Sequence, residues 1–246
     1  MKEIKAILTV QSNRLIAKNT YEMVLSGSTA ALTRPGQFIN IQLDGFFLRR
    51  PISVCDWNEN TLTIIYKAVG HGTEYMASMQ AGQKLDVLMG LGNGFDTAKS
   101  GQKPLLIGGG AGVPPMFALG KALKAQGKQP VAVLGFNTAE EVFYVNEFEQ
   151  AGIPVLVSTA DGSVGTKGFV TDIIRDLPDY TYFYTCGPEP MLKAVYNTAV
   201  TSGQMSFEER MGCGFGACMG CSCKTKYGNK RICKDGPVLE KEEVIW

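Results

Sequence analysis

Four cysteines near the end of the chain are the residues with the clearest capacity for chemistry. They form the pattern C-x4-C-x2-C followed, after eleven residues, by a fourth cysteine; they are Cys213, Cys218, Cys221 and Cys233. Thiolates in such spacings bind iron–sulfur clusters or zinc. Glycine lets a loop bend tightly around an inorganic core, and glycines lie between the cysteines at 212, 214, 216 and 220. The segment is therefore predicted to be a metal-binding loop.

The spacing favours a [2Fe–2S] cluster over a single zinc ion. Plant-type [2Fe–2S] proteins space their first three ligands as C-x4-C-x2-C, with the fourth later in the chain. Structural zinc sites more often show two short C-x2-C knuckles or paired histidines. Zinc and incidental thiols remain the alternative interpretations. Cys223 is a fifth thiol nearby, and we interpret it as a bystander, because a C-x-C step would strain a bond that Cys233 makes without strain.

Composition excludes several classes of function. A chain of 246 residues is long enough for two small domains and a cluster module. A formal net charge of +1 gives no electrostatic sign of a nucleic-acid partner. The sequence contains neither an apolar run long enough to span a membrane nor a long apolar segment at its start. Seven cysteines, four of them assigned to a cluster, favour a reducing compartment, so we expect a cytoplasmic protein.

The single histidine, His71, excludes a Rieske centre, which needs two imidazole ligands. It also leaves no material for a histidine-based metal site or catalytic triad. Electron transfer depends on bound cofactors more than on titrating side chains. We therefore predict electron transfer and assign no catalytic side chain.

The first part of the chain reads as a β domain. Short, alternating, β-branched runs separated by Gly, Pro and Asn predict an antiparallel barrel or sandwich. The expected strands are 4–10, 21–27, 37–43, 49–57, 61–69 and 84–90, with a short helix at 72–79.

After Lys103 strands alternate with helices, which predicts a doubly wound parallel sheet. We expect strands at 104–110, 130–136, 153–159 and 180–187, helices at 114–127, 168–177 and 188–200, and a mixed segment at 140–150. The polar, Gly-rich stretch 92–103 marks a boundary near residue 100. The expected domains are therefore 1–100, 101–205 and 206–246.

Glycine turns end two of the predicted parallel strands. Gly108, Gly109, Gly110 and Gly112 open the helix at 114–127, and the amides of a helix N-terminus favour a phosphate. The string is not G-x-G-x-x-G, so a plain tight turn remains an alternative. Cys186 and Gly187 likewise stand at the end of the strand expected at 180–187, just before a helix. The alternative for Cys186 is a small buried core residue without a binding role. Two such ends side by side form the crevice in which nucleotides bind.

Two segments of the β domain could also bind phosphate. Arg50 and Ser53, in the run RRPIS, offer a phosphate fork and a short hydroxyl, with proline fixing the backbone between them. An edge strand with a solvated arginine is the ordinary alternative. The run KAVGHGT at 67–73 is another glycine turn that leads into a helix.

In this order, the R-P-I-S, G-x-G-T, GGG-AG-PP and CGP-x-x-M segments resemble the ferredoxin–NADP reductase superfamily. Together with the cysteine spacing, the whole chain resembles the electron-transfer subunits of NAD-dependent, heteromeric (type B) dihydroorotate dehydrogenases. The resemblance implies an antiparallel Greek-key FAD-binding barrel at 1–100, an NAD-binding α/β domain at 101–205 and a [2Fe–2S] module at 206–246.

The resemblance also implies roles for individual residues. Residues implied to bind FAD are Arg50 at the pyrophosphate, Ser53 at the isoalloxazine, and Pro51, Ile52, Lys67, Val69, Gly72 and Thr73. Residues implied to lie at the NAD pyrophosphate are Gly109, Gly110, Ala111 and Gly112, and those near the nicotinamide are Cys186, Gly187 and Pro188. The cluster ligands would be Cys213, Cys218, Cys221 and Cys233.

The implied activity is oxidation of dihydroorotate to orotate with NAD, in pyrimidine biosynthesis. It requires an FMN-containing catalytic partner in a heterotetramer of two of each chain, from which electrons pass through the cluster and FAD to NAD. The neutral and acidic stretch 135–141 favours NAD over NADP, since a 2′-phosphate needs a basic partner. Trp246 lies beyond the cluster segment, so we do not assign it the flavin-stacking role of a terminal aromatic residue. The alternatives are a reductase subunit of a hydrogenase, a glutamate synthase-like enzyme or an oxygenase, and a zinc-binding scaffold without enzymatic activity.

Overall fold

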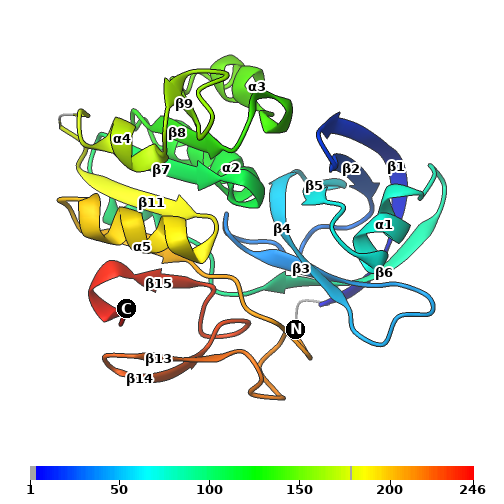
Figure 1. Ribbon diagram of the computed structural model, residues 1–246. Coiled ribbons are helices and arrows are strands. Elements are labelled where there is room, and N and C mark those ends of the chain that lie inside the picture. The colour runs from blue at the N-terminus through cyan, green and yellow to red at the C-terminus, as the bar shows by residue number, and fades with distance from the viewer. Residues whose placement is uncertain (1–3, 178) are drawn as a thin grey trace.

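The chain forms a closed β-barrel and then an α/β sheet, and its last segment packs beneath both (Figure 1). The structure is a computed structural model that describes residues 4–177 and 179–246. Within these ranges, none of the helices has the length and apolar character needed to cross a membrane.

The barrel consists of antiparallel strands in the order β1-β2-β5-β4-β3-β6, and β6 pairs back with β1. Its strands are β1 (Lys5–Ala17), β2 (Thr20–Ser26), β3 (Phe38–Gln42), β4 (Arg50–Trp57), β5 (Thr61–Lys67) and β6 (Lys84–Leu91). Alternate residues point inward, so Met23, Ile39 and Ile64 meet in one buried core. Helix α1 (His71–Ala77) lies between β5 and β6 in the chain. The predicted antiparallel barrel is confirmed.

The sheet has the order β10-β9-β8-β7-β11-β12-β15, and every neighbouring pair except β12 with β15 is parallel. Its strands are β7 (Pro104–Gly109), β8 (Val131–Phe136), β9 (Val155–Thr159), β10 (Thr166–Lys167), β11 (Tyr182–Cys186), β12 (Gly203–Ser206) and β15 (Val238–Glu240). The helices are α2 (Val113–Ala125), α3 (Val145–Gln150), α4 (Val170–Ile174) and α5 (Glu189–Thr198). Two hydrophobic clusters cover the sheet, one with α2 and α3 and one with α4 and α5. The doubly wound fold is confirmed.

Three of the predicted elements differ in detail. The strand expected at 4–10 is β1, which continues to Ala17. The helix expected at 168–177 ends at Ile174, because the N–H groups of Asp176 and Leu177 bond to carbonyls three residues back, as in a 3-10 turn. The mixed segment at 140–150 contains α3 after a 3-10 turn. The 3-10 turns are Thr97–Lys99, Gly110–Gly112, Ala139–Glu141 and Lys241–Glu243.

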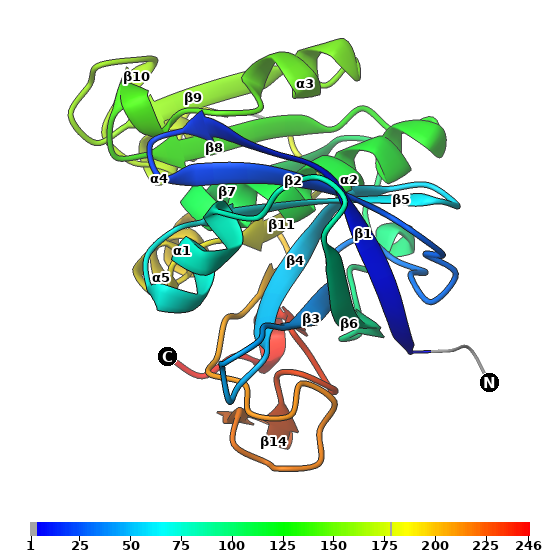
Figure 2. The same cartoon turned by 90° about the vertical axis from the view of Figure 1, so that its right-hand side faces the viewer.

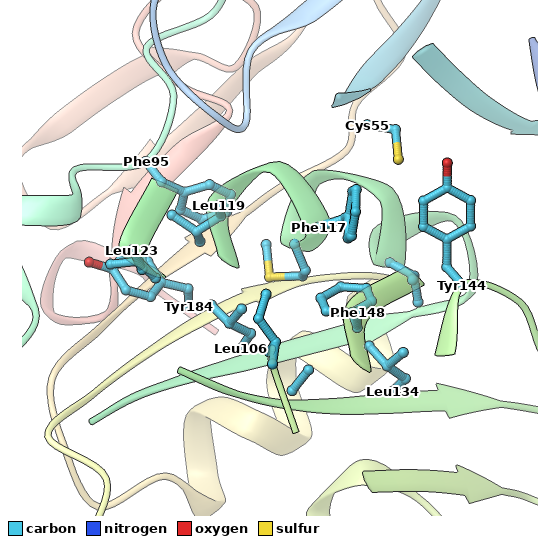
Figure 3. Close-up of a cluster of buried hydrophobic side chains, with 14 of the residues drawn as sticks. Cys55, Phe95, Leu106, Phe117, Leu119, Leu123, Leu134, Tyr144, Phe148 and Tyr184 are labelled. Atoms are coloured by element: carbon cyan, nitrogen blue, oxygen red, sulfur yellow. The ribbon is translucent and has the colours of Figure 1, made fainter. Parts of the chain in front are cut away.

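Helix α2 packs between the sheet and the barrel strand β4. Figure 3 shows the core around it, in which Phe117 meets Tyr144 edge-on with ring centroids 5.2 Å apart. The Tyr144 hydroxyl lies near Cys55 of β4 and donates a hydrogen bond of 2.7 Å to the buried Glu22 of β2. Arg14 pairs with the same carboxylate at 2.8 Å. Barrel and sheet therefore share one packed interface.

The predicted 206–246 module leaves the sheet after β12 and returns to it at β15, the neighbour of β12; residues 207–237 between these strands are the cluster segment. Phe207 N–H donates to the carbonyl of Pro237 at 2.9 Å, directly beyond the paired residues Ser206 and Val238. Between these points lies a hairpin of β13 (Ser222–Thr225) and β14 (Gly228–Arg231). Figure 2 shows this segment beneath β3 and β6 of the barrel. The division into three domains stays a prediction, and the third segment contributes a strand to the sheet of the second.

Candidate functional site

The two predicted glycine turns meet at the carboxyl edge of the sheet. β7 and β11 are neighbours, with Cys186 paired to Gly108. A Cβ atom at Gly112 would overlap the carbonyl group of Cys186, and one at Gly109 or Gly187 would overlap Met191. Because these three positions have no side chain, the turn after β7 packs directly against the backbone of the turn after β11, and both turns pack against Met191. Burial raises the pKa of the Cys186 thiol, so the thiol is neutral at this edge.

Gly110 and Ala111 face a pocket rather than a packed interior. Gly110 has φ +50°, and nothing lies within 4 Å of the position where its Cβ would stand. Ala111 is exposed. Together with Tyr66 and Lys67 of β5 they line a pocket between barrel and sheet. The N-terminus of the 13-residue helix α2 begins just after them, at Val113. The open backbone and the helix N-terminus can receive a pyrophosphate.

The predicted flavin segment lies on β4, next to the start of α1. The Arg50 guanidinium stands over the Phe46 ring, 4.8 Å from its centroid, and donates to the carbonyl of Leu48. A Cβ atom at Gly72 would overlap this guanidinium. The structure thus brings Arg50 and Gly72 together, as a shared phosphate site requires. Pro51, Ile52 and Ser53 are half-buried along the same strand.

The remaining predicted flavin residues have partners within the protein. Lys67 Nζ lies 3.0 Å from Glu141 Oε1 across the interface. Although burial acts to raise the pKa of Glu141, hydrogen bonds from Lys67 and Asn137 lower it below its usual value. Thr73 Oγ1 accepts N–H bonds from the turn before α1, at 3.0 Å from Val69 and 3.3 Å from Gly70, and Val69 itself is exposed. The Thr73 hydroxyl therefore stabilises the turn that presents Gly72, a role the sequence did not predict.

The four predicted cluster ligands form two pairs. Cys213 Sγ accepts N–H bonds from Ala217 at 3.2 Å and from Cys218 at 3.5 Å, and Cys221 Sγ accepts an N–H bond from Cys233 at 3.4 Å. Burial acts to raise the pKa of Cys213, but these backbone donors lower it below the usual thiol value. A thiol that ionises easily is a ready metal ligand.

Four cysteine thiols in two pairs fit a [2Fe–2S] cluster, in which each of the two irons takes two thiolates. Cβ positions at Gly212 and Gly220 would stand 3.3 Å and 3.6 Å from Cys218 Sγ, so these glycines keep the sulfur uncrowded.

Comparisons with known proteins agree with this geometry. The family model for the iron–sulfur cluster binding domain of dihydroorotate dehydrogenase B matches residues 208–245, and the oxidoreductase NAD-binding domain matches residues 106–197. The electron transfer subunit of dihydroorotate dehydrogenase B (NAD(+)) from Fusobacterium nucleatum is 47% identical, over 96% of each chain. The corresponding subunit from a Geobacillus species is 43% identical, over 97% of each chain. The chain belongs to this family of electron transfer subunits.

Solved structures support the same fold for the family member described here. An NADH-dependent reduced ferredoxin-NADP oxidoreductase, studied for flavin-based electron bifurcation, aligns with a TM-score of 0.89 at 30% identity, over 100% of this chain and 92% of its own. A ferredoxin NADP+ reductase from Neisseria gonorrhoeae aligns with a TM-score of 0.68 at 16% identity, over 80% and 91%. The second likeness concerns the fold alone. The predicted family and fold are confirmed.

Cys223 and Trp246 both pack against the hydrophobic cluster that contains Cys221 and Cys233, and their interpretations stay predictions. Cys223 lies on β13, outside both thiol pairs, and burial raises its pKa. Trp246 packs against Tyr196 of α5 and against Phe207, with ring centroids 6.1 Å and 5.8 Å away. Its contacts are with the sheet side of this electron transfer subunit.

Sequence reasoning missed the polar residues that hold the cluster segment. Asn40 Nδ2 of β3 donates to the carbonyl of Cys213 at 3.4 Å, and Arg231 Nη1 donates to that of Gly216 at 3.0 Å. Asn93 Nδ2 donates to the carbonyl of Val238 at 2.7 Å. For Asn40, the available signal was an amide within the otherwise apolar run FINI, which is unusual in a buried strand.

Proposed function

We propose that this chain carries electrons from a dihydroorotate-oxidising partner to NAD, as the names of its relatives describe. The partner would contain FMN, and two copies of each chain would form a heterotetramer. All seven cysteines lie in the described part of the chain and none is in a disulfide, which supports a cytoplasmic location. When bound, the [2Fe–2S] cluster carries single electrons and FAD gathers two, so that two single transfers balance the reduction of one NAD+ to NADH.

The observation that carries this proposal is the central position of strand β4. On one side β4 pairs with β3, whose Asn40 contacts the loop of the predicted cluster ligand Cys213. On the other side β4 packs against α2, the helix that follows the predicted NAD turn. The predicted flavin segment thus lies between the other two cofactor regions. We propose residues 1–100, 101–205 and 206–246 as the FAD, NAD and cluster domains.

In this proposal the side chains bind and orient the cofactors, and none acts as acid or base. Arg50 and Gly72, in the first turn of α1, would hold the FAD phosphates, and Pro51, Ile52 and Ser53 the ring system. Further residues proposed around FAD are Lys67, Val69 and Thr73. Gly109, Gly110, Ala111 and Gly112 would hold the NAD pyrophosphate, with Cys186, Gly187 and Pro188 near the nicotinamide. The proposed iron ligands are Cys213, Cys218, Cys221 and Cys233.

NAD is the proposed nicotinamide substrate. Glu140 and Glu141 follow β8, where the 2′-phosphate of NADP would need a basic partner. Lys18 pairs with Glu140 at 2.8 Å, and Lys67 pairs with Glu141. Both nearby lysines are therefore engaged by carboxylates. Comparing kcat/KM for NADH and NADPH in flavin reduction tests this preference, and equal values would contradict it.

The test of the whole proposal is reconstitution with the partner. The chain is copurified anaerobically with the dihydroorotate-oxidising flavoprotein of the same organism, and NADH formation from dihydroorotate is followed. We expect activity only when both chains are present. Cys221→Ser should abolish it, whereas the matched variant Cys223→Ser should keep both iron and activity. A brown, NADH-reducible protein that neither binds this partner nor supports the reaction would refute the dihydroorotate assignment.

A further inference from the structure

Asn40 joins the barrel to the cluster loop at the residue that carries the first predicted ligand. Its side chain is fully buried, and Nδ2 donates to the Cys213 carbonyl at 3.4 Å. Gly214 closes over the same amide, because a Cβ atom there would overlap Asn40 Nδ2. The backbone directly after the Cys213 side chain is therefore in contact with one barrel residue.

Strand alternation explains why Asn40 faces the loop. Ile39 and Ile41 point into the barrel core. Phe38, on the opposite face, packs in the cluster of side chains that includes Cys221 and Cys233. Since successive residues of a strand alternate between faces, Asn40 shares the outer face with Phe38. The cluster segment thus meets β3 through one aromatic and one amide side chain.

The same face of the barrel carries the predicted flavin segment. In the β3–β4 register, Asn40 is opposite Pro51 and Phe38 is opposite Ser53. Residues directly opposite in an antiparallel pair point to the same side, with Cβ atoms about 5 Å apart. Asn40 is therefore a direct neighbour of the residues proposed to hold the flavin ring.

The second atom of the amide supports a role beyond packing. Asn40 Oδ1 is buried and has no hydrogen-bond partner among the described residues. A buried acceptor without a donor is destabilising, and folding alone would favour an apolar side chain here. An amide that donates to the cluster loop, on a residue that stands opposite Pro51 of the flavin segment, is instead suited to a junction between two cofactors.

We propose that Asn40 is a positioning residue that fixes the cluster relative to the flavin and so sets the rate of electron transfer between them. This inference rests on the proposed function. Asn40 contacts no iron and no substrate in the proposal; it acts through the Cys213 backbone on one side and the β3–β4 ladder on the other.

The test compares Asn40→Leu and Asn40→Asp with Gln42→Leu. Leucine and aspartate have nearly the size of asparagine but cannot donate to the Cys213 carbonyl. Gln42 is a matched control, because it lies on the same strand and face and its amide donates to Leu43 and Phe46 outside the cluster segment. Iron, sulfide and FAD contents are measured first, followed by the EPR spectrum and midpoint potential of the reduced cluster. Stopped flow then separates flavin reduction by NADH from the subsequent reduction of the cluster.

We expect both Asn40 variants to keep their cofactors and their rate of flavin reduction, and to reduce the cluster about tenfold more slowly, with altered EPR and potential. Gln42→Leu should match the wild type. Gly214→Ala, which displaces the same amide from the loop side, should reproduce the spectral change.

Several results would overturn the inference. Wild-type transfer rates and EPR spectra in both Asn40 variants would do so. Loss of the cluster from both variants, with Gln42→Leu unaffected, would reduce Asn40 to a role in assembly. Absence of iron or flavin from the wild-type protein would instead refute the proposed function, and the two failures are thus distinguishable.

Discussion

The carboxyl edge of the sheet and the cluster loop are both predicted to hold cofactors, but different forces shape them. β7 is buried along its whole length, and its turn packs against that of β11 through glycines. The cluster loop, residues 211–221, contains neither helix nor strand, and Cys218 and Met219 are exposed. Besides burial of Cys221 at its end, polar contacts from Asn40 and Arg231 to its backbone hold it.

The sheet edge is therefore formed by packing before a nucleotide binds, whereas the cluster loop needs its metal cluster to complete its structure. Burial of apolar side chains fixes the sheet edge whether or not a nucleotide is bound. A loop held by a few hydrogen bonds gains little stability from each. Metal binding then contributes directly to the folding of such a segment. The two regions should therefore respond differently to the same perturbations.

Cluster removal should give the largest contrast. Chelation of iron under oxidising conditions removes the sulfur–iron bonds, so we expect the amides of Ala217 and Cys218 to lose their hydrogen-exchange protection entirely. The amides of β7 and β11 should exchange as before. Hydrogen exchange of the holoprotein and the chelated protein, read by mass spectrometry, checks this. A sheet that loosens together with the loop would remove the distinction between the two regions.

Gly112→Ala should be the most damaging single substitution at the sheet edge. The new methyl group would overlap the Cys186 carbonyl, which is backbone, so the two turns must separate at a cost of about 3 kcal/mol. Gly110→Ala is the matched control: its Cβ position is open and only its φ of +50° is unfavourable, which costs about 1 kcal/mol. Urea unfolding measures both. Equal losses would show that the turns are not tightly packed.

Arg231→Lys should weaken the cluster loop without affecting the sheet. Arg231 donates to the Gly216 carbonyl and, through Nε at 2.9 Å, to Asp235. Lysine keeps the charge but cannot make both contacts. We expect the visible absorbance of the cluster to bleach about tenfold faster in mild denaturant, with unchanged NADH-dependent flavin reduction. Lys224→Arg on β13, which is exposed, serves as the control for a change of basic residue.

The same ion pair predicts a smaller dependence on pH. The hydrogen bond from Arg231 lowers the pKa of Asp235 to about 2, against about 3.9 in an unfolded chain. Because the folded value is the lower one, the stabilisation is complete above about pH 4 and is lost as the pH falls toward 2. The ratio of cluster-loss rates between Asp235→Asn and the wild type should be constant from pH 6 to about 4 and decrease below it. A constant ratio down to pH 3 would contradict the assignment.

The same contrast explains what the sequence could predict. The barrel could be predicted from the alternation in runs such as TLTIIYK, and the sheet from strands separated by helices. Both patterns can be read within a short stretch of sequence, because hydrophobic periodicity is a local property. The cysteine spacing and the glycine turns are local as well. β12 and β15 are too short to show a period, at four and three residues. The sequence interpretation therefore missed the strand that ties the cluster segment to the sheet.

Long-range polar contacts could not be predicted from the sequence, for a different reason. Asn40 and Cys213 are 173 residues apart in the chain, and nothing in either segment alone indicates that they meet. Likewise, Lys67 meets Glu141 only because the barrel packs against the sheet. The predicted binding roles of Lys67 and Thr73 remain predictions, now with known protein partners.

The pairing of β12 with β15 has a consequence for exchange of parts between proteins. Because the cluster segment leaves one strand and returns to its neighbour, its two ends are held together at the bond between Phe207 and Pro237. A segment with clamped ends can be lengthened, shortened or replaced by a tight turn with little change in the entropy of closing the loop. The cluster segment is thus a long connection between two antiparallel strands, and it can be exchanged without changing either strand. A reductase with or without its own cluster could then share one barrel and one sheet.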